Sequence, residues 1–167
     1  MVQERTLILS EKQILQKIRR IAYQIYESNS EEKQLVVVAI EQRGSKLADM
    51  LVEVLKEIAP FAIERLDLSI DKRQPLRLPK LSGDEALMAD RAVVLVDDVL
   101  NSGRTLMYAA SHLLQQPIRR LVTVVLVDRL HRRFPIKADF VGITLSTTLQ
   151  DHIAVEFDGV GVRAYLE

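Results

Sequence analysis

The sequence predicts an α/β fold: an open, mainly parallel twisted sheet with helices on both faces. Two observations lead to this prediction. Continuous apolar runs, which are typical of strands buried on both faces of a parallel sheet, recur along the chain. Segments with the apolar periodicity of helices lie between these runs, and such alternation favours a parallel sheet. A chain of 167 residues fits one domain, so we expect residues 1–167 to form a single unit.

The first predicted helix begins at Ser10, because Ser10-Glu11-Lys12-Gln13 has the pattern of a capping box. Apolar residues then recur at helical spacing over the following turns. A buried strand is predicted at residues 35–40. A helix over residues 45–58 comes next, and Pro60 helps to end it.

The order of strand and helix continues through the rest of the chain. Residues 61–70 alternate between apolar and polar side chains, which indicates a half-exposed strand. The remaining predicted elements are a strand at 92–96, a helix at 103–115, and strands at 121–127 and 140–143.

One long connection, residues 71–90, has no predicted helix or strand and is interrupted by Pro and Gly. Long connections of this kind are uncommon in compact domains and often form mobile lids. The segment is basic, beginning with Lys72 and Arg73. We therefore predict that residues 67–90 form a mobile lid over an anionic substrate, with a plain solvated loop as the alternative.

Composition excludes several classes of protein. The chain has no Cys, which excludes disulfides, thiolate metal sites and Cys nucleophiles and leaves the cytoplasm as the expected compartment. Lys plus Arg equal Asp plus Glu at 23 each, so no overall field draws the protein to nucleic acid or anionic lipid. No apolar segment is long enough to span a bilayer, and the first residues lack the apolar region of a secretory signal. We expect no membrane association.

The most informative segment is residues 93–105, Val-Val-Leu-Val-Asp-Asp-Val-Leu-Asn-Ser-Gly-Arg-Thr. It places Asp97 and Asp98 at the carboxyl end of a buried strand, where ligands bind in open parallel sheets. Both carboxylates can accept hydrogen bonds from vicinal sugar hydroxyls if the chain bends at Asp98, because adjacent strand residues point to opposite faces. Ser102 and Gly103 then open a helix whose first N–H groups favour a phosphate. The segment therefore predicts a site for ribose 5-phosphate.

Other interpretations fit parts of this segment. A hydrophobic strand ending in two Asp resembles a Walker B segment, but the chain has no Gly-x-x-x-x-Gly-Lys loop and no Gly-x-Gly-x-x-Gly pattern. A receiver domain would have an acidic pair after its first strand, where this chain has Glu41 alone. Finally, Asp98 or Asn101 could simply cap a helix.

The segment resembles the signature of the type I phosphoribosyltransferases that binds 5-phosphoribosyl 1-pyrophosphate (PRPP). Motifs along nearly the whole chain are most similar to the bifunctional pyrimidine-operon attenuation regulator/uracil phosphoribosyltransferase family. These motifs are Gln42-Arg43-Gly44, residues 96–100, residues 126–132 and residues 135–142. The resemblance implies the type I phosphoribosyltransferase fold with a small hood or lid, and an enzyme of the glycosyltransferase class.

The resemblance also implies a role for each matching position. Asp97 and Asp98 would bind the ribose hydroxyls, and the 5-phosphate would contact Asn101, Ser102, Gly103, Arg104 and Thr105. Pyrophosphate would contact the loop Gln42, Arg43 and Gly44 and, from a separate segment, Arg132. In the Gln42–Gly44 loop the superfamily often has a cis peptide bond before a residue other than proline. The base would contact Val99, Phe140 and Val141. The lid would contribute Lys72 and Arg73, and the segment after the third buried strand would contribute Asp128 and Arg129.

The reaction implied by the resemblance is displacement of pyrophosphate from the anomeric carbon of PRPP by a ring nitrogen of a nucleobase. Mg²⁺ would accompany PRPP with oxygen ligands mainly from substrate and water, and no direct protein ligand is assigned to it. The lid would exclude water and prevent hydrolysis of PRPP. Because the superfamily usually forms dimers or larger assemblies, we expect a homodimer or higher homo-oligomer.

Several positions depart from the related enzymes. Asn101 stands where 6-oxopurine enzymes have an Asp that serves a purine ring nitrogen, and Asp128 stands where they have a Lys. Both changes favour uracil over a purine base. Lys72 replaces an Arg in the lid and lacks its bidentate geometry. Leu130 replaces a Gly of the regulator family.

The resemblance leaves other functions open. The chain could be a nucleotide-sensing regulator of pyrimidine genes that binds RNA with weak or no catalysis. Its support would be the basic residues of the first helix, Lys12, Lys17, Arg19 and Arg20. However, Arg19 and Tyr23 stand where the family has a Thr and a His associated with RNA binding. A purine-base phosphoribosyltransferase and a subunit that binds PRPP without catalysis are the remaining alternatives.

Overall fold

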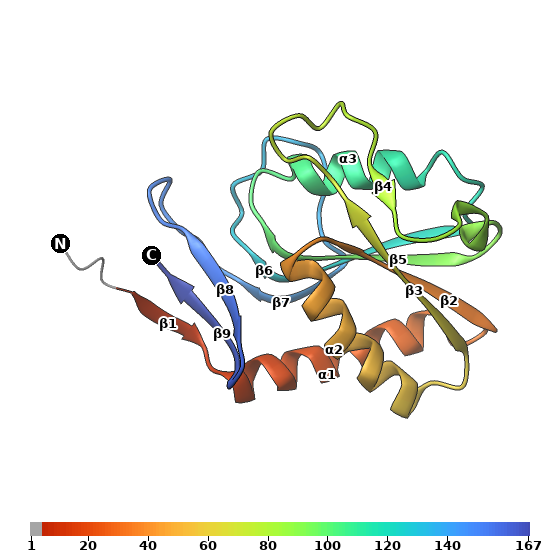
Figure 1. Ribbon diagram of the computed structural model, residues 1–167. Coiled ribbons are helices and arrows are strands. Elements are labelled where there is room, and N and C mark those ends of the chain that lie inside the picture. Colours follow the sequence, from red (N-terminus) through yellow and green to blue (C-terminus); the bar gives the residue numbers. More distant parts are fainter. Residues whose placement is uncertain (1–4) are drawn as a thin grey trace.

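The computed structural model describes residues 5–167 and contains two sheets (Figure 1). The larger sheet has six strands in the order β4-β3-β2-β5-β6-β7. All neighbouring pairs in it are parallel except β3 and β4. The smaller sheet is antiparallel, with the order β1-β9-β8. The prediction of an α/β fold with a mainly parallel sheet is confirmed.

The strands and helices have the following bounds. The larger sheet comprises β2 (Gln34–Ile40), β3 (Ala62–Ser69), β4 (Lys80–Leu81), β5 (Ala92–Leu100), β6 (Arg120–Asp128) and β7 (Phe140–Thr144). The smaller sheet comprises β1 (Thr6–Leu9), β8 (Ile153–Asp158) and β9 (Gly161–Leu166). The helices are α1 (Glu11–Ser28), α2 (Arg43–Ile58), α3 (Arg104–Leu113) and the short 3-10 helix η1 (Glu85–Met88).

Helices cover both faces of the larger sheet (Figure 1): α1 and α2 lie on one face and α3 on the other. Alternate residues of β2 serve the two faces. Those that pack toward α1 and α2 are Leu35, Val37 and Ala39, and those that pack toward α3 are Val36, Val38 and Ile40. All six are fully buried, which explains why this strand is a continuous apolar run in the sequence.

The helix boundaries follow local sequence signals closely. The capping box of α1 is confirmed: the N–H of Gln13 donates to Ser10 Oγ at 3.3 Å, and the N–H of Ser10 donates to Gln13 Oε1 at 2.9 Å. α2 begins at residue 43 rather than 45, and α3 spans residues 104–113 rather than 103–115. No helix within residues 5–167 is long and apolar enough to cross a membrane.

The smaller sheet is absent from the sequence-based prediction. β8 and β9 form a hairpin in which Asp158 pairs with Gly161, and β1 joins its other edge through pairs such as Thr6 with Leu166. The Asp158-Gly159 dipeptide, between two segments of alternating polarity, was a usable hairpin signal. Because β8 contacts both β5 and α2, this sheet lies beside the larger one and can contribute to a site there.

The prediction that residues 71–90 have no helix or strand was wrong in part. β4 pairs with the end of β3 through Leu68 and Leu81, and η1 buries Met88 completely. Residues 71–79 form the irregular part of this segment, in which Leu76 and Leu78 are 86% and 81% exposed. The basic start of the predicted lid thus lies in a loop, whereas its second half is packed against the protein.

Candidate active site

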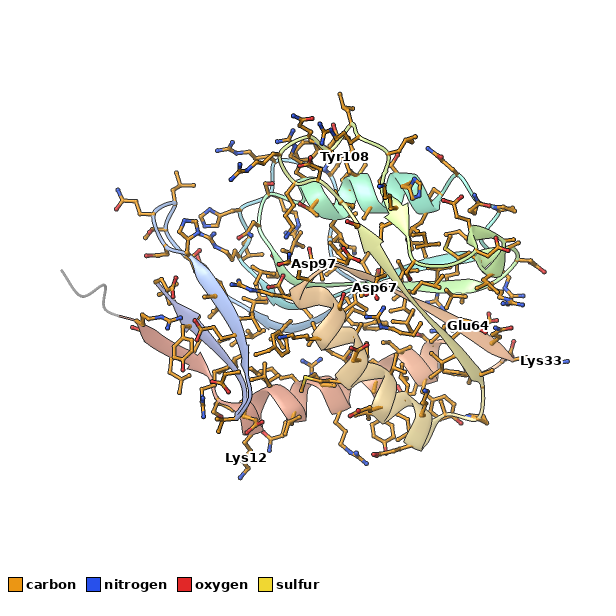
Figure 2. The ribbon with its side chains drawn as sticks, viewed as in Figure 1. Lys12, Lys33, Glu64, Asp67, Asp97 and Tyr108 are labelled. Carbon is orange, nitrogen blue, oxygen red and sulfur yellow. The ribbon has the colours of Figure 1, made fainter. Side chains whose placement is uncertain are left out.

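A cavity of about 620 Å³ opens at the carboxyl ends of β2, β3 and β5, the edge at which ligands bind in open parallel sheets. Figure 2 shows Asp97 near the middle of the molecule, beside the start of α2. The lining residues are Glu41, Gln42, Arg43, Ser69, Ile70, Lys72, Asp97, Asp98, Val99, Leu100, Asn101, Ser102, Gly103, Arg104, Thr105, Leu106, Val125 and Ile153. Most residues predicted to bind ribose 5-phosphate and pyrophosphate therefore share one cavity.

Asp97 and Asp98 are both buried in this cavity wall, with 5% and 7% of their surface exposed. β5 continues past both residues to Leu100, and within residues 92–100 Asp98 is the one position without a register partner in β6. The N–H of Asp98 donates to Asp97 Oδ1 at 2.9 Å. Both carboxyls nevertheless line the same cavity, although the strand continues past them.

The pKa of the Asp97 carboxyl is raised well above its ordinary value. Burial is the largest cause, and the negative charge of Asp98 and a hydrogen bond with its side chain add to it. The positive charge of Lys72 acts in the opposite direction. The two carboxyls therefore interact directly, and a basic residue of the lid segment lies near enough to affect them.

The turn between β5 and α3, residues 101–105, is the predicted phosphate loop. Gly103 has a φ of 84°, a left-handed conformation that other residues rarely adopt, and an added Cβ would lie 2.8 Å from Ile136 Cγ2. The Ser102 carbonyl accepts the N–H groups of Arg133 and Phe134 at 2.8 and 3.1 Å, which fixes the loop. Gly103 is the N-cap of α3 and makes no side-chain cap, so the amino end of this helix can receive an anion.

The turn after β2 carries the predicted pyrophosphate loop. The Glu41–Gln42 peptide bond is cis, as the resemblance implied. Gly44 lies against β5: an added Cβ would be 3.0 Å from the carbonyl oxygen of Val96, so a larger residue would push the turn away. This close approach brings Gln42 and the exposed Arg43 to the same cavity as the carboxylate pair.

Three further lining residues had no assigned role in the sequence analysis. Ser69 ends β3 and Ile70 follows it, both within the predicted lid segment 67–90, and Ile153 comes from β8. Ile153 could not be predicted as a lining residue because its strand, β8, was not predicted. In the lid segment, Lys72 lines the cavity whereas Arg73 does not.

The residues after β6 lie outside the cavity lining. Asp128 is 4% exposed, forms an ion pair with Arg132, and accepts the N–H of Leu130 at 2.9 Å. Leu130 has a φ of 61°, a left-handed conformation that glycine adopts more readily than leucine. Arg132 is held by a carboxylate, whereas the side chain of Arg129 donates a hydrogen bond to the lining residue Asn101 at 2.9 Å.

The residues predicted to contact the base are not brought together. Val99 lines the cavity, whereas Phe140 and Val141 do not. Phe140 is half-buried and packs against the core on the α1 and α2 side of the sheet. The carbonyl of Val141 accepts a hydrogen bond from Arg20 at 2.9 Å. The sequence pattern could not show whether Phe140 packs in the core or stacks on a base, because both favour the same apolar side chain.

Two of the basic residues of α1 are engaged within the protein. Arg20 donates to the carbonyls of Val141 and Gly142 at 2.9 and 3.0 Å. Arg19 pairs with Glu57 at 3.5 Å. Lys12 instead projects outward near the amino end of α1, away from Asp97 (Figure 2).

Comparison with known proteins identifies the family to which the chain belongs. A profile of the family described as phosphoribosyl transferase domain matches residues 5–161. The bifunctional protein PyrR of Haemophilus ducreyi is 34% identical and the alignment covers 96% of each chain. The bifunctional protein PyrR 2 of Lactiplantibacillus plantarum is 39% identical, covering 85% of this chain and 87% of that one.

Solved structures share the fold at lower identity. The hypoxanthine phosphoribosyltransferase of Trypanosoma cruzi superposes with a TM-score of 0.79 at 17% identity and covers 95% of each chain. A hypoxanthine-guanine phosphoribosyltransferase of Bacillus anthracis gives a TM-score of 0.71 at 23% identity, covering 83% of this chain and 81% of that one. The type I phosphoribosyltransferase fold is therefore confirmed. With the profile and the curated relatives, it shows that the chain belongs to the phosphoribosyltransferase family, enzymes of the glycosyltransferase class, and within it to the group of bifunctional PyrR proteins.

Proposed function

We propose that the protein transfers the phosphoribosyl group of PRPP to uracil, giving UMP and pyrophosphate. The observation that carries this proposal is the meeting of Asp97 and Asp98 with the amino end of α3 at one cavity, across the left-handed Gly103. Carboxylates accept hydrogen bonds from vicinal hydroxyls, and the first N–H groups of a helix bind phosphate. Ribose 5-phosphate carries both groups.

In the proposed reaction a ring nitrogen of the base attacks the anomeric carbon of PRPP while the bond from that carbon to pyrophosphate breaks. Positive charge develops on the ribose in the transition state, and the negative charge shared by the Asp97–Asp98 pair would stabilise it. Arg43, which lines the same cavity, would bind the departing pyrophosphate. Lys72 would contact the anionic substrate when the lid segment closes, and closure would exclude water.

Mg²⁺ is part of the proposal, because it would neutralise the pyrophosphate leaving group. Hard oxygen donors line the cavity on Glu41, Asp97 and Asp98, which suits this ion. Residues 5–167 contain no cluster of three or more side chains that could hold a metal. We therefore assign most of its ligands to PRPP and water.

Uracil is the proposed base because of two residues near the cavity. The amide of Asn101 cannot act as a general base toward a purine ring nitrogen. Asp128, which is paired with Arg132, offers no cation to a purine oxygen. A purine base is the alternative. For Phe140 and Val141 to contact either base, the base would have to extend from the cavity to β7.

The proposal is tested by incubating the protein with PRPP, Mg²⁺ and a panel of nucleobases while pyrophosphate release is followed. We expect turnover with uracil, and a loss of at least about a hundredfold in kcat/KM for Asp98→Asn, the scale seen when one group that stabilises transition-state charge is removed. Asp49→Asn, an exposed carboxylate outside the cavity lining, is the matched control and should retain activity. Absence of turnover with every base, together with unchanged PRPP affinity in Asp98→Asn, would disprove the proposal.

A second candidate function is an RNA-binding regulator of pyrimidine genes. Its support is the resemblance to the attenuation-regulator family and the relatives named bifunctional protein PyrR. Because the net charge is zero, RNA binding would depend on a local patch and would weaken steeply with salt. Fluorescence anisotropy with a labelled pyrimidine-operon leader RNA, with and without UMP and at two salt concentrations, tests it. No change in anisotropy under any of these conditions would exclude this function.

We also propose that the protein forms a cytoplasmic homodimer or higher homo-oligomer. The family resemblance supports an assembly, and the exposed Leu76 and Leu78 offer apolar surface for a second copy. The absence of Cys supports the cytoplasmic compartment. Light scattering at micromolar concentration tests the assembly, and a monomer there would refute it. Cell fractionation tests the compartment, where recovery outside the soluble cytoplasmic fraction would be the contrary result.

A further inference from the structure

Arg129, the residue after β6, is a buried cation that no carboxylate side chain in residues 5–167 pairs with as a salt bridge. Only 6% of its surface is exposed. Its guanidinium donates to four oxygens of neutral groups: Asn101 Oδ1 at 2.9 Å, Thr147 Oγ1 at 3.0 Å, and the carbonyls of Thr148 and Asp151 at 3.1 and 2.5 Å. Its own N–H donates to the carbonyl of Leu100 at 3.0 Å. Arg129 thus joins the start of the phosphate loop to the segment 147–151.

These contacts determine how the amide of Asn101 is oriented. A guanidinium has hydrogen-bond donors and no acceptor, so the atom of Asn101 that faces Arg129 must be the oxygen Oδ1. The NH₂ group, Nδ2, is the other end of the amide and makes no hydrogen bond within residues 5–167. Asn101 is exposed and lines the cavity. The group left for a ligand is therefore a hydrogen-bond donor.

An asparagine without such a partner could turn either end of its amide toward the ligand, because the two ends differ only in the hydrogen bonds that they make. With Oδ1 turned toward Arg129, the end of this side chain that faces away from Arg129 is the donor Nδ2. Holding the amide before binding also reduces the ordering cost of association.

We infer that Arg129 is a positioning residue that holds Asn101 as a fixed donor to an acceptor oxygen of the ligand. This inference rests on the proposed function, since it concerns the same cavity. The acceptor oxygen can come from two sources with the same chemistry, a phosphate oxygen of the ribose 5-phosphate group or a carbonyl oxygen of the base. Arg129 itself does not line the cavity and acts through Asn101.

The first test measures ligand affinity in variants of the full chain. Asn101→Asp keeps the size of the side chain and its link to Arg129 but replaces the donor by an acceptor. We expect about a tenfold or greater loss, since one hydrogen bond contributes about 1 kcal/mol and a repulsion is added. Calorimetry with ribose 5-phosphate reports a phosphate source, and the KM for the base reports a carbonyl source. Unchanged values in both measurements would overturn the inference.

The second test is a double-mutant cycle that separates positioning from general stability. Arg129→Lys loses the forked geometry and should weaken the same ligand several-fold, but it should have no further effect in an Asn101→Ala background. Equal effects of Arg129→Lys in both backgrounds would show a merely structural role. The control Thr147→Val removes one partner of Arg129 and leaves Asn101 in place, so it should lower the thermal stability but keep the affinity.

A third measurement needs neither activity nor ligand and so separates failure of this inference from failure of the proposed function. In the free protein, the side-chain amide of Asn101 should be as rigid as the backbone by ¹⁵N relaxation, and it should become mobile in Arg129→Lys. An Asn101 amide that is equally mobile in both proteins would overturn the inference even if transfer activity is found. If Arg129→Lys does not fold, the mobility of the wild-type amide still decides the question.

Discussion

Two regions predicted to form the site differ in how the structure uses them. The ribose-phosphate region, Asp97, Asp98 and residues 101–105, lies in one continuous stretch of chain, and every residue in it lines the cavity, as does the predicted base contact Val99 within that stretch. The base-side region, by which we mean Asp128, Arg129, the predicted pyrophosphate contact Arg132, and Phe140 and Val141, does not line the cavity. Its residues pair with one another or pack in the core, as Asp128 does with Arg132 and as Phe140 does beside α1 and α2. A contiguous turn therefore keeps its predicted place, whereas side chains from separate elements depend on how tertiary contacts orient them.

The largest effect should come from changing the turn of the ribose-phosphate region. Gly103→Val places a branched residue at a φ of 84° and a Cβ 2.8 Å from Ile136 Cγ2. We expect a loss of about 2–3 kcal/mol in the free energy of unfolding, and at least about a hundredfold loss in PRPP affinity from displacement of the phosphate loop. Urea unfolding and calorimetry measure the two.

The matched control for this change is Gly159→Ala, because an added Cβ at Gly159 has no neighbour within 4 Å. This variant should leave PRPP affinity unchanged and alter stability only slightly. If Gly103→Val binds PRPP as well as the control does, the amino end of α3 is not the phosphate site.

The next effect concerns pH and the cost of burying a carboxylate in the ribose-phosphate region. Because the pKa of Asp97 is raised in the folded state, the unfolded chain ionises first as the pH rises. The stability contribution is fully present below the ordinary pKa of Asp and is lost as the pH rises through the folded value. Asp97→Asn removes this loss, so the variant should unfold at a higher temperature than the wild type at pH 8.

Thermal unfolding of both proteins between about pH 4, near the ordinary pKa of Asp, and pH 8 measures this difference. The gap between the two curves should widen as the pH rises. Parallel curves would mean that Asp97 titrates normally and that its burial carries no cost.

A smaller effect tests the base-side region directly. Phe140→Leu should cost about 1 kcal/mol in the free energy of unfolding, because a half-buried ring is replaced by a smaller apolar side chain in the core. The affinity for ribose 5-phosphate and the KM for the base should stay the same. A rise in the KM for the base alone, at unchanged stability, would instead support stacking of Phe140 on the base.

The smallest effect should be a gain in stability. Leu130 is 52% exposed and has a φ of 61°, so its side chain contributes little burial while its backbone is strained. Leu130→Gly should raise the free energy of unfolding by up to about 1 kcal/mol, because the greater entropy of unfolded glycine offsets part of the relief. A decrease in stability on chemical denaturation would show that the Leu130 side chain contributes more than its exposure indicates.

Much of the fold could be predicted because its signals are local. The capping box at Ser10, the apolar run of β2 and the turn at Gly103 each depend on a few neighbouring residues, and each occurs where expected. The same is true of the cavity edge, since parallel strands must all end there. The missed hairpin of β8 and β9 was local too, and the Asp158-Gly159 dipeptide could have revealed it.

The other parts of the site could not be predicted because they depend on contacts between distant segments. Ile153 reaches the cavity only because β8 belongs to the smaller sheet and contacts β5. The lid segment was expected to be irregular, but its second half is paired through β4 and buried through Met88. No pattern in residues 71–90 alone specifies these contacts.

The sequence by itself determined the parallel sheet, the order of its elements and the turn that joins Asp97 and Asp98 to α3, because periodicity and turn chemistry act over a few residues. Only the tertiary structure decided which neighbouring side chains line the cavity. It packed the half-buried Phe140 against the core, paired Arg132 with Asp128, and placed Arg129 against Asn101. The physical reason is that an apolar side chain can be buried, and a charged side chain can be paired, by the protein as well as by a ligand. Only long-range packing selects between the two.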